Sequence, residues 1–259
     1  MKNFLRFGIL LLLNIDYFLC VSERNGYKPL IERKMVEGSP ASTSEFAFIA
    51  AIFLKNEFVG AFSLINSRTL IGAAKIIESN DVHDYYGRIG NKNKYEGTNL
   101  TFTKKFIHPD HGLVGNVHDI ALLILQEPVH NMLPIDLPGS NEMFTNGLVK
   151  IVGWETKNSD HDTNFLQVAE ANLMDPQSAA RQFGMSITGE EIVAVPSEGK
   201  VVKGEYGSPL IFTNKSGKQI LIGILTNPSN TDKEPDIYLS TSVNIDFINR
   251  YRCEKDSCV

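Results

Sequence analysis

Short apolar runs, rich in β-branched and aromatic residues, make up most of this chain and constrain its fold more than any other feature. Gly, Pro, Asn and Asp clusters separate these runs, and this alternation is typical of an all-β sandwich or barrel. Helical patterns are sparse. An Asp175-Pro176 pair suited to a helix start precedes 177–183, and apolar residues recur at helical spacing within 243–252. The apolar runs are 46–54, 58–65, 69–74, 100–102, 120–125, 148–152, 166–171, 209–212 and 220–225.

Composition narrows the class of protein further. The chain has 259 residues, 42% of them hydrophobic and 21% charged, which excludes wholesale disorder and fibrous repeats. The formal charge of −5 gives no reason to expect a nucleic-acid partner or a polybasic membrane contact. The length suits one large domain or two smaller ones.

The first 22 residues have the pattern of a signal peptide. Lys2 and Arg6 supply the positive end, the apolar run 7–13 follows, and Cys20 and Ser22 are small residues suited to a cleavage site. The alternative, a membrane anchor, is disfavoured because the run is short and interrupted by polar residues. We therefore expect a secreted, extracellular protein that is soluble after cleavage.

Cysteine usage is low for a secreted chain. Three cysteines are too few for a disulfide-framework fold, and cleavage after Ser22 removes Cys20. The remaining pair, Cys253 and Cys258, can either form one small loop at the C-terminus or stay free.

Six segments occur in the order found in one enzyme family. They are 34–38, 63–76, 118–122, 152–154, 204–209 and 236–238, and they resemble the motifs of the chymotrypsin-like (trypsin-like) serine proteases. The resemblance implies two six-stranded antiparallel β-barrels with a short C-terminal helix. It also implies a signal peptide at 1–22, a propeptide at 23–34 and a protease-like domain at 35–259. Cleavage after Lys34 would free the amine of Met35, which the resemblance pairs with Glu205.

The residues at the family's reactive positions do not suit its chemistry. That chemistry needs a Ser nucleophile, a His base and an Asp that orients the His. The resemblance places Tyr206, Lys75 and Asp119 at these three positions. A protonated lysine accepts no proton, so we expect Lys75 to form an ion pair with Asp119 and the protein to be catalytically inactive.

The substrate-binding positions are also altered. The resemblance puts Lys200 at the base of the specificity pocket and Asp236 at its wall, where the family has Gly. The segment that pairs with a substrate strand reads Thr226-Asn227-Pro228, and proline has no N–H to donate. These features argue independently against peptide cleavage.

Other motifs are weaker. His108, His111 and His118 could suggest a metal site, but their spacing is a poor match to known sites, so we expect no metal and no cofactor. The sequons at Asn99 and Asn214 predict glycosylation on exposed loops of a secreted chain. The resemblance further places Gly60 and Ile76, among others, where family members carry bridging cysteines.

Within the family, the chain is most similar to the inactivated serine protease paralogues of the scabies mite, which are related to the group 3 mite allergens. That resemblance implies a monomer that binds host defence proteins such as complement components and takes part in immune evasion. Two alternatives stay open: a decoy that sequesters protease inhibitors, and a residual peptidase.

Overall fold

The computed structural model describes residues 39–113, 117–156, 164–197, 202–203, 205–229 and 234–252. All of them belong to the unit that spans Lys34–Val259. The predicted signal peptide, the propeptide, Met35, Lys200, Cys253 and Cys258 therefore lie outside the described residues.

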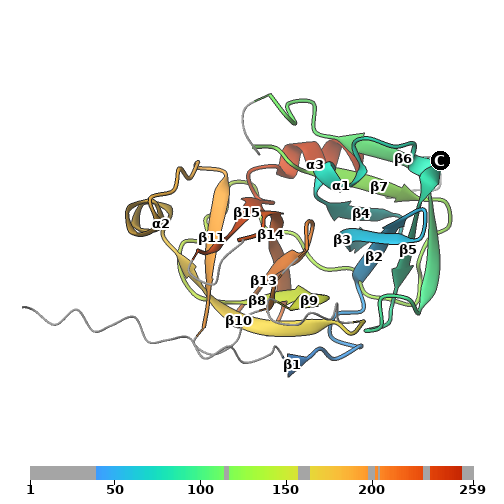
Figure 1. Cartoon of the computed structure of the whole chain (residues 1–259), viewed down its shortest axis with the longest axis horizontal. Helices are drawn as coiled ribbons and strands as arrows, with labels where there is room; N and C mark the ends of the chain where they lie inside the picture. Colours follow the sequence, from blue (N-terminus) through green and yellow to red (C-terminus); the bar gives the residue numbers. More distant parts are fainter. Residues whose placement is uncertain are drawn as a thin grey trace, which may run out of the picture. The chain divides into compact units, whose positions relative to one another are not determined.

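The first half of this unit is a closed six-stranded antiparallel barrel with the order β2-β3-β4-β7-β6-β5 (Figure 1). Pairing of β5 with β2, from Arg88 opposite Ala51 to Tyr85 opposite Leu54, closes the ring. Five of the six strands arise from the apolar runs identified in the sequence. The strands are β2 (Ile49–Leu54), β3 (Glu57–Asn66), β4 (Thr69–Gly72), β5 (Tyr85–Ile89), β6 (Thr98–Ile107) and β7 (Ala121–Leu125).

The second half closes in the same way, so the prediction of two six-stranded antiparallel barrels is confirmed. Its ring runs β8-β10-β11-β15-β14-β13 and returns to β8. A short strand β1 (Ser39–Pro40) adds to the edge of β10, and β9 (Glu155–Thr156) pairs separately with β12 (Val202–Lys203). The six strands are β8 (Leu148–Gly153), β10 (Gln167–Met174), β11 (Glu191–Pro196), β13 (Pro209–Thr213), β14 (Gln219–Asn227) and β15 (Asp236–Ser240).

The helices are short, and two of them were predicted. Asp175 caps α2 (Pro176–Phe183), accepting the Ser178 N–H at 2.9 Å, and α3 (Ile245–Tyr251) buries its apolar face. A single turn, α1 (Ala74–Ile77), and a 3₁₀ turn, η1 (Val82–Asp84), follow β4. No helix in the described part of the chain is both long and apolar enough to cross a membrane.

Three barrel strands, β5, β11 and β15, lie outside the apolar runs identified in the sequence. In β5, Gly87 interrupts the apolar pattern and buried residues alternate with half-exposed ones, and β11 begins at Glu191 and ends at Pro196. Residues 74–77, which the sequence assigned partly to a strand, form α1 instead. Pairing with neighbouring strands therefore determines which of these segments become strands, because β-propensity reflects packing more than an intrinsic backbone preference.

The two barrels meet where β3 contacts the turn before β13. The Ala61 N–H donates to the carbonyl oxygen of Tyr206 at 3.0 Å, which ties the barrels together through the main chain. Ile76 packs against Gly60 at the same junction, and a methyl group added at Gly60 would lie 2.5 Å from Ile76 Cδ1. An apolar contact thus occupies two positions that the resemblance assigns to bridging cysteines.

Candidate functional site

Three segments bring the predicted reactive residues together at the junction of the barrels. Lys75 lies in α1, Asp119 lies just before β7, and Tyr206 lies in the turn between Glu205 and β13. The sequence separations are large, so the two barrels must both form before the group assembles. The prediction that these residues share one site agrees with their mutual contacts.

Lys75 and Tyr206 bind each other. The Lys75 ammonium donates a hydrogen bond to the Tyr206 hydroxyl at 3.1 Å and lies 4.4 Å from the centre of its ring. Hydrogen bonding to that hydroxyl raises the pKa of Lys75 above its usual value. Lys75 is therefore charged at neutral pH and has no lone pair with which to accept a proton.

Asp119 is buried and pairs with the main chain instead of with the lysine ammonium. Its Oδ1 accepts the Lys75 backbone N–H at 2.8 Å. Burial raises the pKa of Asp119, against the lowering effect of this hydrogen bond. The expected side-chain ion pair between Lys75 and Asp119 is wrong, because the ammonium turns to Tyr206 and the backbone amide satisfies the carboxylate.

His111 is a member of the site that sequence reasoning missed. Its Nδ1 lies 3.8 Å from Asp119 Oδ1, and its Nε2 lies 2.9 Å from Glu78 Oε2. The imidazole thus sits between two carboxylates, and its second nitrogen is taken by Glu78 rather than by a nucleophile. The histidines of residues 108–111 were noticed in the sequence, but their spacing does not reveal which carboxylates lie near His111 in the fold.

The turn that carries Tyr206 is held rigidly. The Gly207 N–H donates to the carbonyl of Leu225 at 2.8 Å, in addition to the bond between Tyr206 O and Ala61. Gly207 has φ of +83°, and a methyl group there would overlap the carbonyl oxygen of Ala61. Only glycine suits this backbone and this close approach.

Glu205 lies beneath the same turn and is buried. Its Oε2 accepts the Trp154 N–H at 3.0 Å, and the Trp154 ring nitrogen donates to Lys92 O at 2.8 Å. The predicted contact of Glu205 with the amine of Met35 stays a prediction, because Met35 is outside the described residues.

Asp236, the residue assigned to the pocket wall, lies in a packed, polar interior. Asp236 is only 1% exposed, and its Oδ1 accepts the Ser229 N–H at 2.8 Å. Burial, followed by the charges of Asp236 and Glu205, raises the pKa of the Tyr238 phenol well above its usual value. Thr226 is buried, whereas Asn227 is exposed and Pro228 half-exposed at the end of β14.

The predicted glycosylation sites lie in accessible parts of the chain. Asn214 is partly exposed in the turn between β13 and β14, whereas Asn99 is exposed but lies on strand β6, so the expectation of a loop is wrong for Asn99. Asn214 Oδ1 accepts the Ser216 backbone N–H at 3.0 Å, which shapes that turn. Both sequons stay predictions, as does pairing of the two C-terminal cysteines.

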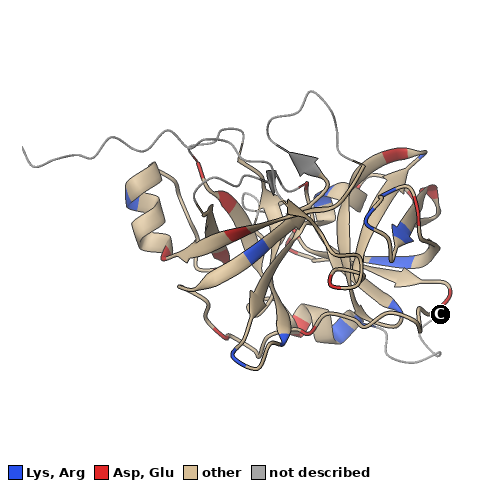
Figure 2. Cartoon of the chain, turned by 90° about the horizontal axis from the view of Figure 1, so that it is seen from below, with Lys and Arg blue, Asp and Glu red and all other residues tan. Residues whose placement is uncertain are grey.

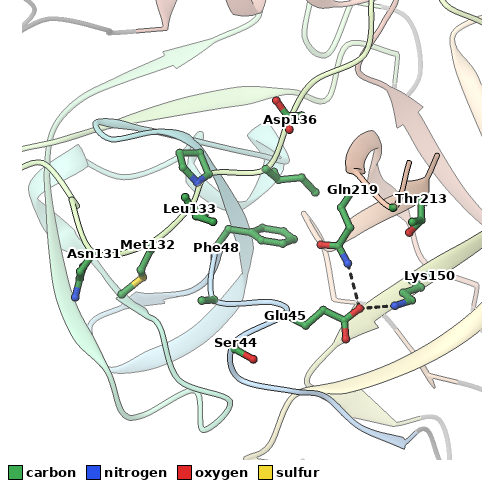
Figure 3. A pocket seen from close by; sticks show the side chains of 14 residues that line it. Ser44, Glu45, Phe48, Asn131, Met132, Leu133, Asp136, Lys150, Thr213 and Gln219 are labelled. Carbon is green, nitrogen blue, oxygen red and sulfur yellow. Dashed lines mark hydrogen bonds and ion pairs between the residues drawn. The ribbon is translucent and has the colours of Figure 1, made fainter. Parts of the chain in front are cut away.

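A pocket of about 740 Å³ lies elsewhere in the unit and contains none of the predicted site residues (Figure 3). At one side Glu45 forms an ion pair with Lys150, and its Oε1 also accepts a hydrogen bond from Gln219 at 3.1 Å. Apolar side chains including Phe48 and Leu133 line the other side, and Leu133 is 88% exposed. Sequence reasoning did not find this hollow, because its lining comes from four separated segments.

Charge is not concentrated in one place on the described chain. Figure 2 shows Lys and Arg positions interspersed with Asp and Glu positions across both barrels.

Comparisons with known proteins agree with this architecture. The model of the trypsin family matches residues 35–248. A mosquito protein named inactive CLIP domain-containing serine protease A8 (Anopheles gambiae) is 27% identical over 246 residues, which cover 83% of this chain and 67% of that protein. Guinea pig chymase (Cavia porcellus) is 28% identical over 170 residues, covering 62% of this chain and 67% of the chymase. The bumblebee venom serine protease Bi-VSP (Bombus ignitus) is 26% identical over 218 residues, covering 73% and 60% respectively.

Proposed function

Because this chain belongs to the trypsin family of serine proteases, we propose that it has kept the family's fold while losing its chemistry, and that it acts by binding another protein. One observation carries the proposal. The Lys75 ammonium and the Tyr206 hydroxyl, which occupy the positions of base and nucleophile by resemblance, bind each other at 3.1 Å. A relative whose name includes "inactive" also supports the loss of protease activity.

Peptide cleavage by this family needs a general base that takes a proton from a serine hydroxyl. Lys75 has its proton held by Tyr206, and the Tyr206 oxygen stands at the far end of an aromatic ring. Asp119 is bound to the Lys75 backbone N–H, so it does not orient a base toward a nucleophile. Loss of the nucleophile or the base alone costs about 10⁶ in rate for such a triad.

His111 does not restore the missing base. One of its nitrogens faces Asp119, as in a working triad, but the other lies 2.9 Å from Glu78 Oε2. A general base must present a free lone pair within hydrogen-bond reach of the nucleophile. The imidazole is directed away from that role.

The substrate-binding positions are altered as well. Asp236 places a buried carboxylate where the family has a glycine by resemblance, and it is held by the Ser229 N–H. Pro228 has no N–H for an added peptide strand. A peptide therefore has neither a reactive group nor a complete binding edge, so binding of a folded partner is the remaining role for the surface.

For the partner, we propose a host defence protein, with complement components first, on the basis of the resemblance to the inactivated mite paralogues. We further propose that the protein is secreted and monomeric. The experiment adds the purified mature protein to human serum and measures complement activation together with peptide release. The proposal expects reduced activation with no new cleavage products, whereas an unchanged activation in every complement pathway contradicts it.

Two matched variants locate the binding surface in the same assay. Tyr206→Phe removes only the hydroxyl at the junction of the barrels, and Leu133→Glu changes an 88% exposed side chain at the pocket of Figure 3. Inhibition that survives Tyr206→Phe rules out catalysis as its cause. Loss of inhibition in Leu133→Glu alone assigns the partner to the pocket side.

A further inference from the structure

The loop between β6 and β7 brings two histidines side by side that are ten positions apart in the sequence. The His108 N–H donates to Ile120 O at 3.1 Å, which closes the base of the loop. His118 has φ of +61°, which turns its side chain back toward His108. The two imidazole rings stack with their centres 4.3 Å apart.

Asp110 completes a group of three side chains with metal-ligating atoms. One nitrogen from each of His108 and His118 and one carboxylate oxygen of Asp110 all lie within 4.8 Å of one another. His108 Nδ1 accepts the Asp110 backbone N–H at 3.2 Å and lies 4.0 Å from Asp110 Oδ2. That nitrogen is therefore unprotonated, with its lone pair engaged by the Asp110 N–H, which a metal ion bound at Nδ1 would displace.

A second set of residues orients His118. Glu190 Oε2 lies 3.3 Å from His118 Nδ1, and Asn244 Oδ1 lies 3.4 Å from the same nitrogen. Of the two, only Asn244 Oδ1 forms a hydrogen bond with Nδ1; this oxygen accepts, so Nδ1 carries the proton and Nε2 keeps its lone pair. His118 Nε2 is therefore the atom available for coordination.

The surroundings of His108 also favour metal coordination by its imidazole. Its side chain is 14% exposed, and it packs against Phe247 with ring centres 4.9 Å apart. This packing holds the His108 ring beside the His118 ring.

We propose that His108, Asp110 and His118 form a binding site for a divalent transition-metal ion, with Zn²⁺ as the best match. Two imidazole nitrogens and one carboxylate oxygen are ligands that Zn²⁺ accepts, and water fills the fourth position. Mg²⁺ and Ca²⁺ fit less well because they prefer oxygen ligands.

Metal binding requires a local rearrangement that this loop can make. Tetrahedral Zn²⁺ with bonds of about 2.0–2.1 Å places its ligand atoms about 3.4 Å apart, so the group must contract and the two rings must leave their stack. The Asp110 side chain is 57% exposed and can approach freely. The proposal departs from the expectation of no metal that the sequence spacing gave.

The test uses the mature protein without a histidine tag, titrated with Zn²⁺ by calorimetry and with Co²⁺ by visible absorption. We expect one ion per chain and tetrahedral Co²⁺ bands. His118→Asn suits the positive φ, because asparagine tolerates this conformation, and should weaken Zn²⁺ binding at least tenfold. Asp110→Asn should weaken it as well.

Two control variants make the result decisive. His130→Asn changes an exposed histidine outside the cluster and should leave the affinity unchanged. His111→Gln tests the neighbouring pair with Glu78 and Asp119, and it should also leave the affinity unchanged. Absence of binding, or binding that His118→Asn leaves intact, overturns the proposal, as does binding lost only in His111→Gln. None of these outcomes bears on the proposed inhibitory function.

Discussion

Gly207 sets the position of Tyr206, and replacing it tests how the site is built. Gly207 has φ of +83°, and its close approach to the carbonyl of Ala61 leaves no room for a side chain. Gly217, in the exposed turn between β13 and β14, has the same φ of +83° with nothing within 4 Å of an added methyl group. The two alanine variants therefore share the backbone strain and differ in the steric overlap.

The expected costs follow from this difference. Alanine in a left-handed conformation costs about 1–2 kcal/mol, which is the whole expected effect of Gly217→Ala. Gly207→Ala adds overpacking of about 1–3 kcal/mol. Displacing the turn also weakens the bond between Ala61 N–H and Tyr206 O. We expect Gly207→Ala to lose at least about 2 kcal/mol more than Gly217→Ala.

Urea unfolding followed by tryptophan fluorescence measures both variants. The chain has one tryptophan, Trp154, which is fully buried and hydrogen-bonded to Glu205 directly below the turn. An unchanged dependence on urea concentration would show that both variants unfold in the same way as the parent. Equal losses of stability in the two variants would refute the assigned close packing of the turn against β3.

Two further predictions concern the loops around the site. Because the pKa of His108 is lowered by burial, the unfolded chain binds more protons, so the free energy of unfolding should fall as pH drops below about 6.5. His108→Phe should reduce this fall in urea titrations at pH 7.5 and 5.5; the charges of His118, Asp110 and His111 act on the same imidazole. Lys105 donates to the carbonyl of Ile77, the last residue of α1, at 2.5 Å and to that of Asn80 at 2.6 Å, so Lys105→Met should cost about 1–3 kcal/mol in chemical unfolding. Lys215→Met, at an exposed lysine in the turn between β13 and β14, is the control, and an equal loss in both would contradict the assigned role.

Strand-forming segments of this chain were largely predictable, because apolar runs with β-branched residues between turn residues are unambiguous. The run 120–125 became β7 and the run 220–225 lies within β14. β5, β11 and β15 lay outside the apolar runs, because their residues alternate or carry polar or Pro residues at the ends. Their pairing with strands that are distant in sequence supplies the stability that local propensity lacks.

The candidate site was predictable in membership but not in contacts. The resemblance of three motifs to those of the serine proteases predicted that Lys75, Asp119 and Tyr206 share one site. In the structure these residues contact one another. The direction of the Lys75 side chain was not predictable, since it depends on a backbone amide satisfying Asp119 and on a hydroxyl at the end of the Tyr206 ring. His111 was likewise hidden, because its partners depend on the path of the loop rather than on spacing.

Incubation of the mature protein with a diverse peptide library, read by mass spectrometry, tests the central claim most directly. The parent protein and Tyr206→Phe are compared at equal concentration, because the substitution removes only the hydroxyl that Lys75 binds. We predict that neither protein cleaves any peptide above the level of a blank preparation. Cleavage by the parent that Tyr206→Phe abolishes would contradict the account, because it would make the Lys75–Tyr206 pair catalytic.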